Sequence, residues 1–579
     1  MQTGLPVSSG QTEKDQTMLT RRRTAGLFAA ATQSILSLFT TKPAAAADPT
    51  EGGSPLRRGK TEPEASHPEP ADRPGGITPT AGTTLSDAEY RPAIHFSPRI
   101  GFMNDPNGLV HDGKQWHLYY QFDPFAPYAG RVHWGHATSP NLYHWQDQPV
   151  AIDQTPAGEA FSGSAVMDAH NTSGLFPEGT GGLVALYTRA APDRQSQYLA
   201  WSTDSGLTFT EYAQNPVLDL QLSSFRDPQV FFHAPTQRWI MCVALSRDHQ
   251  IAFFGSSNLL QWTELSRFGP SGITGVDYEC PNLVEVPIEG GKTAWVLFVS
   301  INPGAPQGGS ATQYFVGTFD GTRFVPESDT TEFVDFAKDF YALQFFTNVP
   351  SGNPVSIGWL NNWQYCQETP ANSWRGVMSL PRRVSLAPDT TQRLKLIQQP
   401  EDLTPLRGIA SDATPPSRMD AGSSWETPLP ASAAHEVRIS VEIDAQPAGL
   451  PPGDKGRSGR FVLNFLNSNE ETLSIGFDAF TAQLWLDRGK LKGFSHPFFT
   501  NSFSAALTPD QRKITLHIVL DKCSVEVFVN NGQQTGSALL FPATPLDRLR
   551  LSATGAGATL SHFELFPLKQ TVRAEEGQI

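Results

Sequence analysis

Three short acidic motifs stand far apart along the 579-residue chain and supply side chains that can act as acids, bases or nucleophiles. They read NDPNG, RDP and DYECP, and their acids of interest are Asp105, Asp227 and Glu279. Each of these acids lies one or two residues before a proline, which disfavours helix at the residue preceding it. A strand-like apolar run follows each motif, so we expect each carboxylate at a rigid turn that enters a strand. This geometry can direct separated acids into one pocket, although each motif taken singly is also ordinary turn chemistry.

The elements that must position these acids are short strands. Between residues 90 and 395, runs such as 116–121, 182–187 and 295–300 are rich in aliphatic and aromatic residues and are separated by Gly, Pro, Asn or Asp. Long apolar stretches with a helical period do not occur. Such a region suits a propeller, a large barrel or stacked sandwiches, and no crisp internal repeat chooses among them. The sequence predicts an all-β protein.

A second β-region follows a proline-rich boundary. Six prolines fall within 396–432, which we interpret as a linker with room for one short helix. From 433 to 579 apolar and polar residues alternate again, with Val437 and Ile439 on one face of a strand. The pair Asn531-Gly532 favours a hairpin turn. This pattern predicts an antiparallel β-sandwich.

The amino-terminal segment is typical of export rather than of a fold. Residues 1–47 combine three arginines at 21–23, a mildly apolar stretch and an A-x-A type cleavage site, which together indicate a twin-arginine-like signal. Residues 48–88 are rich in Pro, Gly, Glu, Ser and Thr and predict a disordered linker. The protein is therefore expected to be exported, to a periplasmic or extracellular location.

The composition of the chain argues against some classes of binding partner. The net charge is −14 and only 17% of residues are charged, so the chain offers no evident basic surface for nucleic acid. No apolar run is long enough to predict a membrane span. The four cysteines, Cys242, Cys280, Cys366 and Cys523, are widely spaced without a C-x-x-C pair, and we expect them to be buried free thiols.

In combination, the three acidic motifs resemble those of the glycoside hydrolase family that contains invertases, exo-inulinases and levanases. Further blocks are similar to that family in the same order along the chain: WGHATS at 134–139, FSGS at 161–164, DFYA at 339–342, WLNNWQY at 359–365 and SVEVF at 524–528. The resemblance implies a catalytic five-bladed β-propeller at 89–395 and a β-sandwich at 433–579. It covers about five-sixths of the chain.

The resemblance also implies a role for each acid. Asp105 matches the family's nucleophile, Glu279 its general acid/base, and Asp227 a carboxylate that binds sugar hydroxyls without covalent chemistry. The residues expected to hold the fructosyl unit are Asn104, Gln121, Ser162, Arg226 and Trp359. The family's hydrolysis needs no metal and no cofactor, and none is expected here.

These roles predict a retaining double displacement. Asp105 must be ionised to attack the anomeric carbon, whereas Glu279 must be protonated to release the leaving oxygen. The two carboxyl groups should then lie about 5–5.5 Å apart. We expect Arg226 to offset part of the negative charge and to orient Asp227.

The expected function is an exported exo-β-fructosidase that hydrolyses terminal β-D-fructofuranosyl residues of levan or inulin, with sucrose as a further candidate substrate. A fructosyltransferase that uses the same covalent intermediate and a non-catalytic carbohydrate-binding protein are the alternatives. One departure from the family concerns 128–133, which lacks the Trp that members commonly carry there, so leaving-group preference stays open. The sandwich is expected to brace the propeller rather than to bind glycan.

Overall fold

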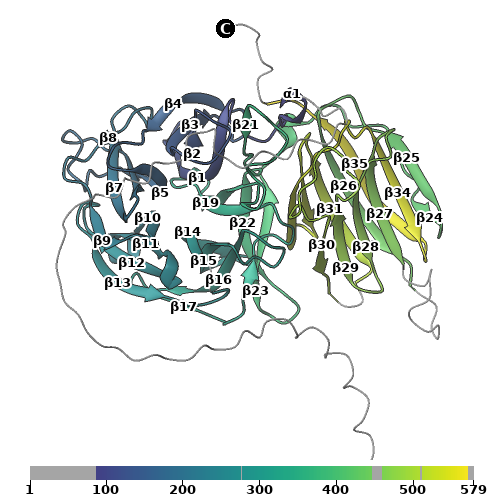
Figure 1. Cartoon of the computed structure of the whole chain (residues 1–579). Coiled ribbons are helices and arrows are strands. Elements are labelled where there is room, and N and C mark those ends of the chain that lie inside the picture. Colours follow the sequence, from purple (N-terminus) through teal and green to yellow (C-terminus); the bar gives the residue numbers. More distant parts are fainter. Residues whose placement is uncertain (1–86, 275–276, 446–458, 509–510, 572–579) are drawn as a thin grey trace, which may run out of the picture. The chain divides into compact units, whose positions relative to one another are not determined.

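The computed structural model describes residues 87–274, 277–445, 459–508 and 511–571 (Figure 1). Within these ranges the chain is almost entirely β-structure, which confirms the all-β prediction. The described helical elements are short: α1 (Asp87–Tyr90) and the 3-10 helices Ala234–Thr236, Ser246–Asp248 and Thr404–Leu406.

None of these described helices has the length and apolar character that a membrane crossing requires. The predicted export signal at 1–47 lies outside the described residues, as does all of the predicted linker at 48–88 except its last two residues.

Three antiparallel sheets follow one another along the first part of the described chain. The first contains β1 (Gly101–His111), β2 (Trp116–Asp123), β3 (His133–Ser139) and β4 (Gln146–Ile152), with the two-residue β21 (Trp374–Arg375) parallel to β1. The second contains β5 (Glu159–Asp168), β6 (Gly182–Ala191), β7 (Arg194–Ser202), β8 (Thr210–Glu211) and β9 (Leu218–Leu222). The third contains β10 (Phe225–His233), β11 (Arg238–Leu245), β12 (Gln250–Ser256) and β13 (Thr263–Phe268).

A nine-stranded sheet comes next and consists of two antiparallel groups. One group is β14 (Asp277–Ile288), β15 (Lys292–Asn302), β16 (Ala311–Phe319), β17 (Phe324–Pro326) and β18 (Glu332–Phe333). The other is β19 (Tyr341–Phe345), β20 (Val355–Trp359), β22 (Arg382–Pro388) and β23 (Leu394–Pro400). A single parallel pair, Ile288 with Leu386, joins the two groups. The predicted runs 116–121, 182–187 and 295–300 lie within β2, β6 and β15 and are confirmed as strands.

The first strands of these five groups form a closed circuit of contacts (Figure 1). Strand β1 contacts β5, β5 contacts β10, β10 contacts β14, β14 contacts β19, and β19 contacts β1. Strands β1, β5, β10 and β19 are buried along most of their length, and β14 is buried in its middle part. Segments that lie more than two hundred residues apart in the chain are thereby brought around one centre.

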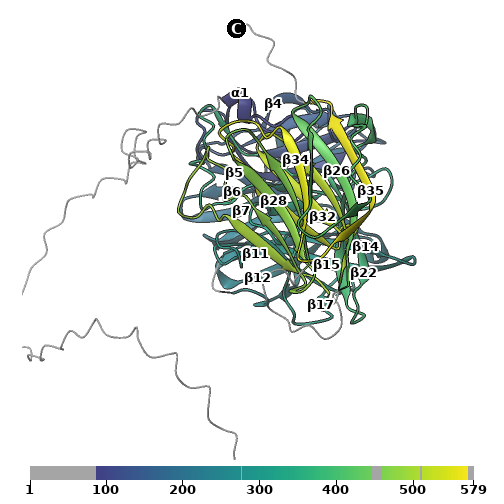
Figure 2. The ribbon, with the colours of Figure 1, turned by 90° about the vertical axis from the view of Figure 1, so that its right-hand side faces the viewer.

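The carboxy-terminal part is built from two six-stranded antiparallel sheets, visible in Figure 1 and, turned by 90°, in Figure 2. One sheet contains β24 (Arg418–Met419), β35 (Ala558–Leu568), β26 (Ala434–Ile443), β31 (Lys513–Leu520), β32 (Ser524–Val529) and β33 (Gln534–Leu539). The other contains β25 (Ser424–Pro428), β34 (Arg548–Thr554), β27 (Arg460–Leu466), β28 (Thr472–Asp478), β29 (Gln483–Asp487) and β30 (Ser502–Ala506). The segment 396–432 thus contains the end of β23, one 3-10 helix, β24 and β25.

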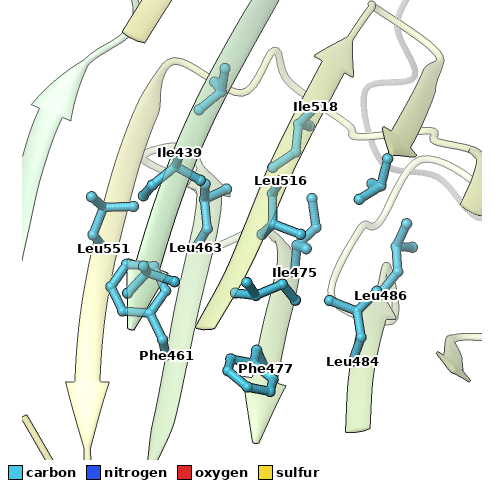
Figure 3. Close-up of a cluster of buried hydrophobic side chains, with 14 of the residues drawn as sticks. Ile439, Phe461, Leu463, Ile475, Phe477, Leu484, Leu486, Leu516, Ile518 and Leu551 are labelled. Atoms are coloured by element: carbon cyan, nitrogen blue, oxygen red, sulfur yellow. The ribbon is translucent and has the colours of Figure 1, made fainter. Parts of the chain in front are cut away.

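Alternation along these strands creates one apolar core between the two sheets. Ile439 and Ile518 from the first sheet meet Leu463, Ile475 and Leu551 from the second, and all are buried (Figure 3). The period-two pattern read from the sequence places such residues on the inner faces. The predicted hairpin at Asn531-Gly532 is also confirmed, since β32 and β33 pair across it.

All four cysteines are buried, as predicted. Burial raises the pKa of the Cys242 thiol to about 12, and it raises the pKa of Cys280 well above the ordinary value, with the charges of Asp105 and Asp227 acting in the same direction. These thiols therefore stay protonated at neutral pH, which suits packing and weak hydrogen bonding rather than nucleophilic chemistry.

Candidate active site

Each of the five strands in the contact circuit carries a β-bulge or register shift near its start. The shifts fall between Met103 and Pro106, Ala160 and Gly163, Arg226 and Gln229, Glu279 and Asn282, and Tyr341 and Gln344. A bulge leaves one residue unpaired and re-aims the side chains around it. The same backbone irregularity is therefore repeated five times around one centre, and the three acids lie at three of these bulges.

The acids do not lie at turns that enter strands, so that prediction was wrong. Asp105, Asp227 and Glu279 belong to β1, β10 and β14 themselves. Asp227 has a φ of 66°, in the left-handed region, rather than the extended conformation expected before a proline. Cys280, which follows Glu279, has a φ of 47°. The bulges impose these conformations, which non-glycine residues adopt only when the surroundings hold them there.

Three side chains contact the carboxylate of Asp105. Ser162 Oγ donates to Asp105 Oδ2 at 2.8 Å, and Asn104 Nδ2 donates to Oδ1 at 3.1 Å. The thiol of Cys280 lies 3.4 Å from Oδ2. Asp105 keeps partial access to solvent, whereas Ser162 is buried. The predicted residues Asn104 and Ser162 are thus in direct contact with the predicted nucleophile.

Asp227 is held mainly by backbone. The backbone N–H of Cys280 donates to Asp227 Oδ2 at 2.9 Å, and the Cys280 Sγ lies 3.7 Å from the same oxygen. The N–H of Asp227 donates in turn to Thr188 Oγ1 at 2.9 Å. Because Cys280 contacts both Asp105 and Asp227 and directly follows Glu279, the structure brings the three acids together around this one residue.

Both oxygens of Glu279 are engaged by side chains. Arg226 donates to Oε1 from Nη2 at 3.0 Å and from Nε at 3.2 Å, and the Tyr341 hydroxyl donates to Oε2. Arg226 also reaches Asp277 at 3.4 Å. The expectation that Arg226 orients Asp227 was therefore wrong. The bulge after Arg226 turns the two neighbouring side chains apart, so the guanidinium binds Glu279 while a backbone N–H holds Asp227.

The charges of the cluster alter its acid–base behaviour. Burial, and next the charge of Glu279, raise the pKa of Asp105 to about 6, against the hydrogen bonds from Ser162, Asn104 and Cys280. Burial raises the pKa of Asp227 to about 7; the charge of Arg226 lowers it, and the charges of Glu279 and Asp105 raise it. Arg226 does offset part of the negative charge, as expected. Carboxyl groups whose protonation changes near neutral pH are typical of sites that transfer protons.

The remaining two predicted residues lie at the margin of this cluster. The amide of Gln121 donates to the carbonyl of Ala160 at 2.9 Å, on the strand that carries Ser162. Trp359 is fully buried, with its ring 6.3 Å from those of Phe102 and Tyr341. Its indole N–H is buried without a hydrogen-bond partner in the described part of the chain. No hydrogen bond between described residues joins Gln121 or Trp359 to an acid.

Sequence reasoning assigned no role to Tyr341, Cys280 or Thr188. Tyr341 stands in the DFYA block and Cys280 in the ECP motif, so both were visible as parts of matched motifs. Thr188 lies in the middle of β6 and carries no sequence signal. Within the described ranges, no group of three or more His, Cys, Asp or Glu side chains is placed to hold a metal ion.

An ionisable pair of carboxyl groups, a third acid beside them and neutral hydroxyl and amide donors are the parts with which glycosidic bonds are broken. The family models agree: glycosyl hydrolases family 32 N-terminal domain matches residues 95–400, and glycosyl hydrolases family 32 C terminal matches 407–567. The chain belongs to this family and is a glycoside hydrolase, which confirms the resemblance read from its motifs.

Individual relatives extend over most of the chain. It is 39% identical over 469 residues to an invertase of Schizosaccharomyces pombe, covering 78% of this chain and 80% of the relative. It is 37% identical over 504 residues to an extracellular exo-inulinase of Meyerozyma guilliermondii, covering 83% and 95%. A solved β-fructofuranosidase from Schwanniomyces occidentalis, complexed with fructosyl-erythritol, superposes with a TM-score of 0.78 at 36% identity and covers 84% of this chain and 99% of that one.

Proposed function

We propose that this glycoside hydrolase is an exported exo-β-fructosidase. It removes terminal β-D-fructofuranosyl residues from fructans of the levan or inulin type and also cleaves sucrose. The observation that carries the proposal is the convergence of Asp105, Asp227 and Glu279 around Cys280. The names of the relatives, an invertase and an exo-inulinase, supply the fructosyl substrate class.

The proposed mechanism is a retaining double displacement. A carboxylate oxygen of Asp105 forms a bond to the anomeric carbon while the bond from that carbon to the leaving oxygen breaks, and Glu279 gives its proton to that oxygen. Water then attacks the same carbon, its proton passes to Glu279, and the bond to Asp105 breaks. Ser162 and Asn104 support this role, because their hydrogen bonds hold the attacking carboxylate in one orientation.

Asp227 is proposed to bind the hydroxyl groups of the fructosyl ring. Its Oδ2 accepts from Cys280, and no hydrogen bond from a described residue reaches its Oδ1, so that oxygen is available for a sugar hydroxyl. The unpartnered indole N–H of Trp359 is a second group that a bound sugar can satisfy. Gln121 completes the proposed subsite at the neighbouring strand.

The architecture proposed for the catalytic part is a five-bladed propeller. Five groups of antiparallel strands, the closed circuit of their first strands and the fivefold bulge support this arrangement. Propellers place their ligand sites where the inner strands meet around the central channel. Export is proposed from the basic and apolar signal-like segment at 1–47, in keeping with the extracellular relative.

Product analysis on levan, inulin and sucrose in parallel tests the activity. Exo-hydrolysis should give fructose as the sole early product from levan and inulin, and fructose with an equal amount of glucose from sucrose. Early oligomers indicate internal cleavage, and products longer than the substrate indicate transfer to sugar. No turnover of any of the three would overturn the proposal. Proton NMR of the first-formed fructose tests the stereochemistry, because release of the inverted anomer rules out the double displacement.

A further inference from the structure

A second carbohydrate site is suggested by the outer face of the sandwich. On β29, Leu484 and Leu486 are buried in the core, so Trp485 between them points to the opposite face of its sheet. There it lines an open depression of about 460 Å³ together with Ser474, Asp487, Lys490 and Asn501. We call these five residues the Trp485 surface. Ser474 lies on β28 and Trp485 and Asp487 on β29, both labelled in Figure 1, and the other two residues lie in the connection from β29 to β30.

The indole of Trp485 lies flat on the sheet. Trp485 pairs with Gly476 on β28, and a Cβ placed on Gly476 would meet three atoms of the indole at 1.9, 2.2 and 2.4 Å. Three ring atoms at nearly equal distances mean that a ring face, not an edge, covers the glycine. The other face of the half-buried ring is directed away from the sheet. A glycine inside a strand often marks a close approach of this kind.

Polar groups surround this ring. Ser474 and Asp487 are direct cross-strand partners, and both are held in place: the Ser474 hydroxyl donates to Asn464 at 2.7 Å, and Asp487 accepts from the N–H of Gly489 at 2.8 Å. The exposed amide of Asn501 and ammonium of Lys490 make no hydrogen bond to another described side chain. The surface thus combines one fixed aromatic face with donors and acceptors that still have bonding capacity.

We propose that the Trp485 surface binds a segment of the fructan substrate. A sugar ring presents C–H groups to an aromatic face, whose partial negative charge attracts them, and directs its hydroxyls sideways to polar groups. The depression is open and of mixed polarity, which fits a neutral polymer lying across it better than a compact protein anchor. The choice of fructan rests on the proposed function. The sandwich then does more than brace the catalytic part.

Retardation of the full-length protein in native gels that contain levan or inulin tests the proposal. Trp485→Ala should lose retardation, with an apparent dissociation constant for the polymer raised on the order of tenfold, the size expected for one stacking contact. Trp425→Ala is the matched control, because Trp425 is also in this sheet but packs on Phe563, 5.6 Å away. Unchanged retardation of Trp485→Ala would overturn the proposal.

Two further measurements keep the result interpretable. If Trp485→Ala unfolds because Gly476 is uncovered, two other variants replace it: Asn501→Ala, at an exposed position, and the conservative Trp485→Phe. The proposal requires that Asn501→Ala weaken the retardation and that Trp485→Phe retain part of it. The kcat/KM for sucrose should stay within about twofold of wild type, since no described hydrogen bond or ring contact joins the Trp485 surface to the acids.

The failure of this proposal is distinguishable from the failure of the proposed function. If wild type is retarded through Trp485 but hydrolyses no fructosyl substrate, the proposed function fails while the binding surface stands. If hydrolysis is normal and retardation is insensitive to Trp485, the binding surface fails while the proposed function stands.

Discussion

Two regions of this molecule bury carboxyl groups with opposite effects on their pKa values. In the acid cluster, burial dominates and raises the pKa of Asp105 to about 6 and that of Asp227 to about 7. Between the first five strand groups and the sandwich, the buried Asp521 and Glu526 have pKa values below the ordinary range, because hydrogen bonds and positive charge outweigh the effect of burial.

The second region, the interdomain network, consists of His95, Arg382, Asp521 and Glu526, whose side chains are fully buried. His95 donates to both carboxylates, at 2.8 Å to Asp521 and 3.0 Å to Glu526. Arg382 and the N–H of Leu380 also donate to Glu526. Partners on both sides raise the pKa of His95 to about 9, so the stability that it contributes is present below its unfolded pKa and is lost as the pH rises through 9.

The difference teaches that close pairing with positive charge, and not burial or hydrogen bonds alone, decides whether the pKa of a buried carboxyl group is lowered or raised. Asp521 accepts from three backbone N–H groups and from the ring of His95 at 3.0 Å or less. Asp335, at the margin of the same region, lies 3.8 Å from Arg382, and burial raises its pKa to about 6 even though Ser537 and Ala337 donate to it. The Asp335 carboxylate has no described positively charged group within hydrogen-bond distance.

The largest expected effect is loss of activity when the reactive carboxylates are neutralised. Asp105→Asn and Glu279→Gln should each reduce kcat/KM for sucrose by about 10⁴-fold or more, because each removes a group that bonds to or protonates the reacting atoms in the proposed mechanism. Steady-state kinetics measure this effect. Asp193→Asn, at an exposed position, is the control and should retain full activity. Residual activity above a tenth of wild type in either variant would remove that acid from the mechanism.

The next largest effect is loss of stability in the interdomain network. Glu526→Gln removes the buried charge that pairs with Arg382 and leaves His95 paired with Asp521 alone, so it should lower the free energy of unfolding by about 3–5 kcal/mol. Denaturant unfolding followed by fluorescence measures it. Glu426→Gln breaks an exposed pairing with Arg548 and Arg550 and should cost at most about 1 kcal/mol. Equal costs for the two variants would contradict the distinction between paired burial and surface pairing.

A smaller effect is expected in the pH dependence of wild-type activity. In the proposed mechanism Asp105 must be ionised to attack, and its pKa is about 6, so kcat/KM should fall about tenfold per pH unit below that value. A pH–rate profile with sucrose well below KM reports the free enzyme. An acid limb near pH 4 instead would mean that the surroundings of Asp105 favour its charge more than the cluster geometry indicates.

The smallest effect is a gain in stability from Asp105→Asn. The folded pKa of Asp105 lies above its unfolded value of about 3.8, so ionisation destabilises the folded protein as the pH rises from about 4 to 6. The amide cannot ionise, and at pH 7 the variant should be more stable than wild type by about 1–3 kcal/mol. Thermal unfolding at pH 7 and pH 4 checks this, and the two proteins should converge at the lower pH. A destabilised variant at pH 7 would show that Asp105 is fully paired.

Much of the fold could be read from local patterns. The alternation in β26 and the Asn531-Gly532 turn were identified because their signals lie within a few residues. The fivefold bulge was missed, because unlike sequences such as RDP in β10 and YAL in β19 produce it. The bulge repeats in backbone geometry but not in amino-acid sequence, so comparing segments of the sequence with one another does not detect it.

The sequence by itself determined most of the strands and membership of the hydrolase family, and it singled out the three acids that the structure brings together, since these depend on residue identity and short-range order. Only the tertiary structure decided which donor meets which acid: that Arg226 binds Glu279, that the backbone of Cys280 holds Asp227, and that Ser162 holds Asp105. These contacts join residues 53 to 57 positions apart on different strands. Their geometry depends on bulges that rotate neighbouring side chains, which residue spacing along one strand does not encode.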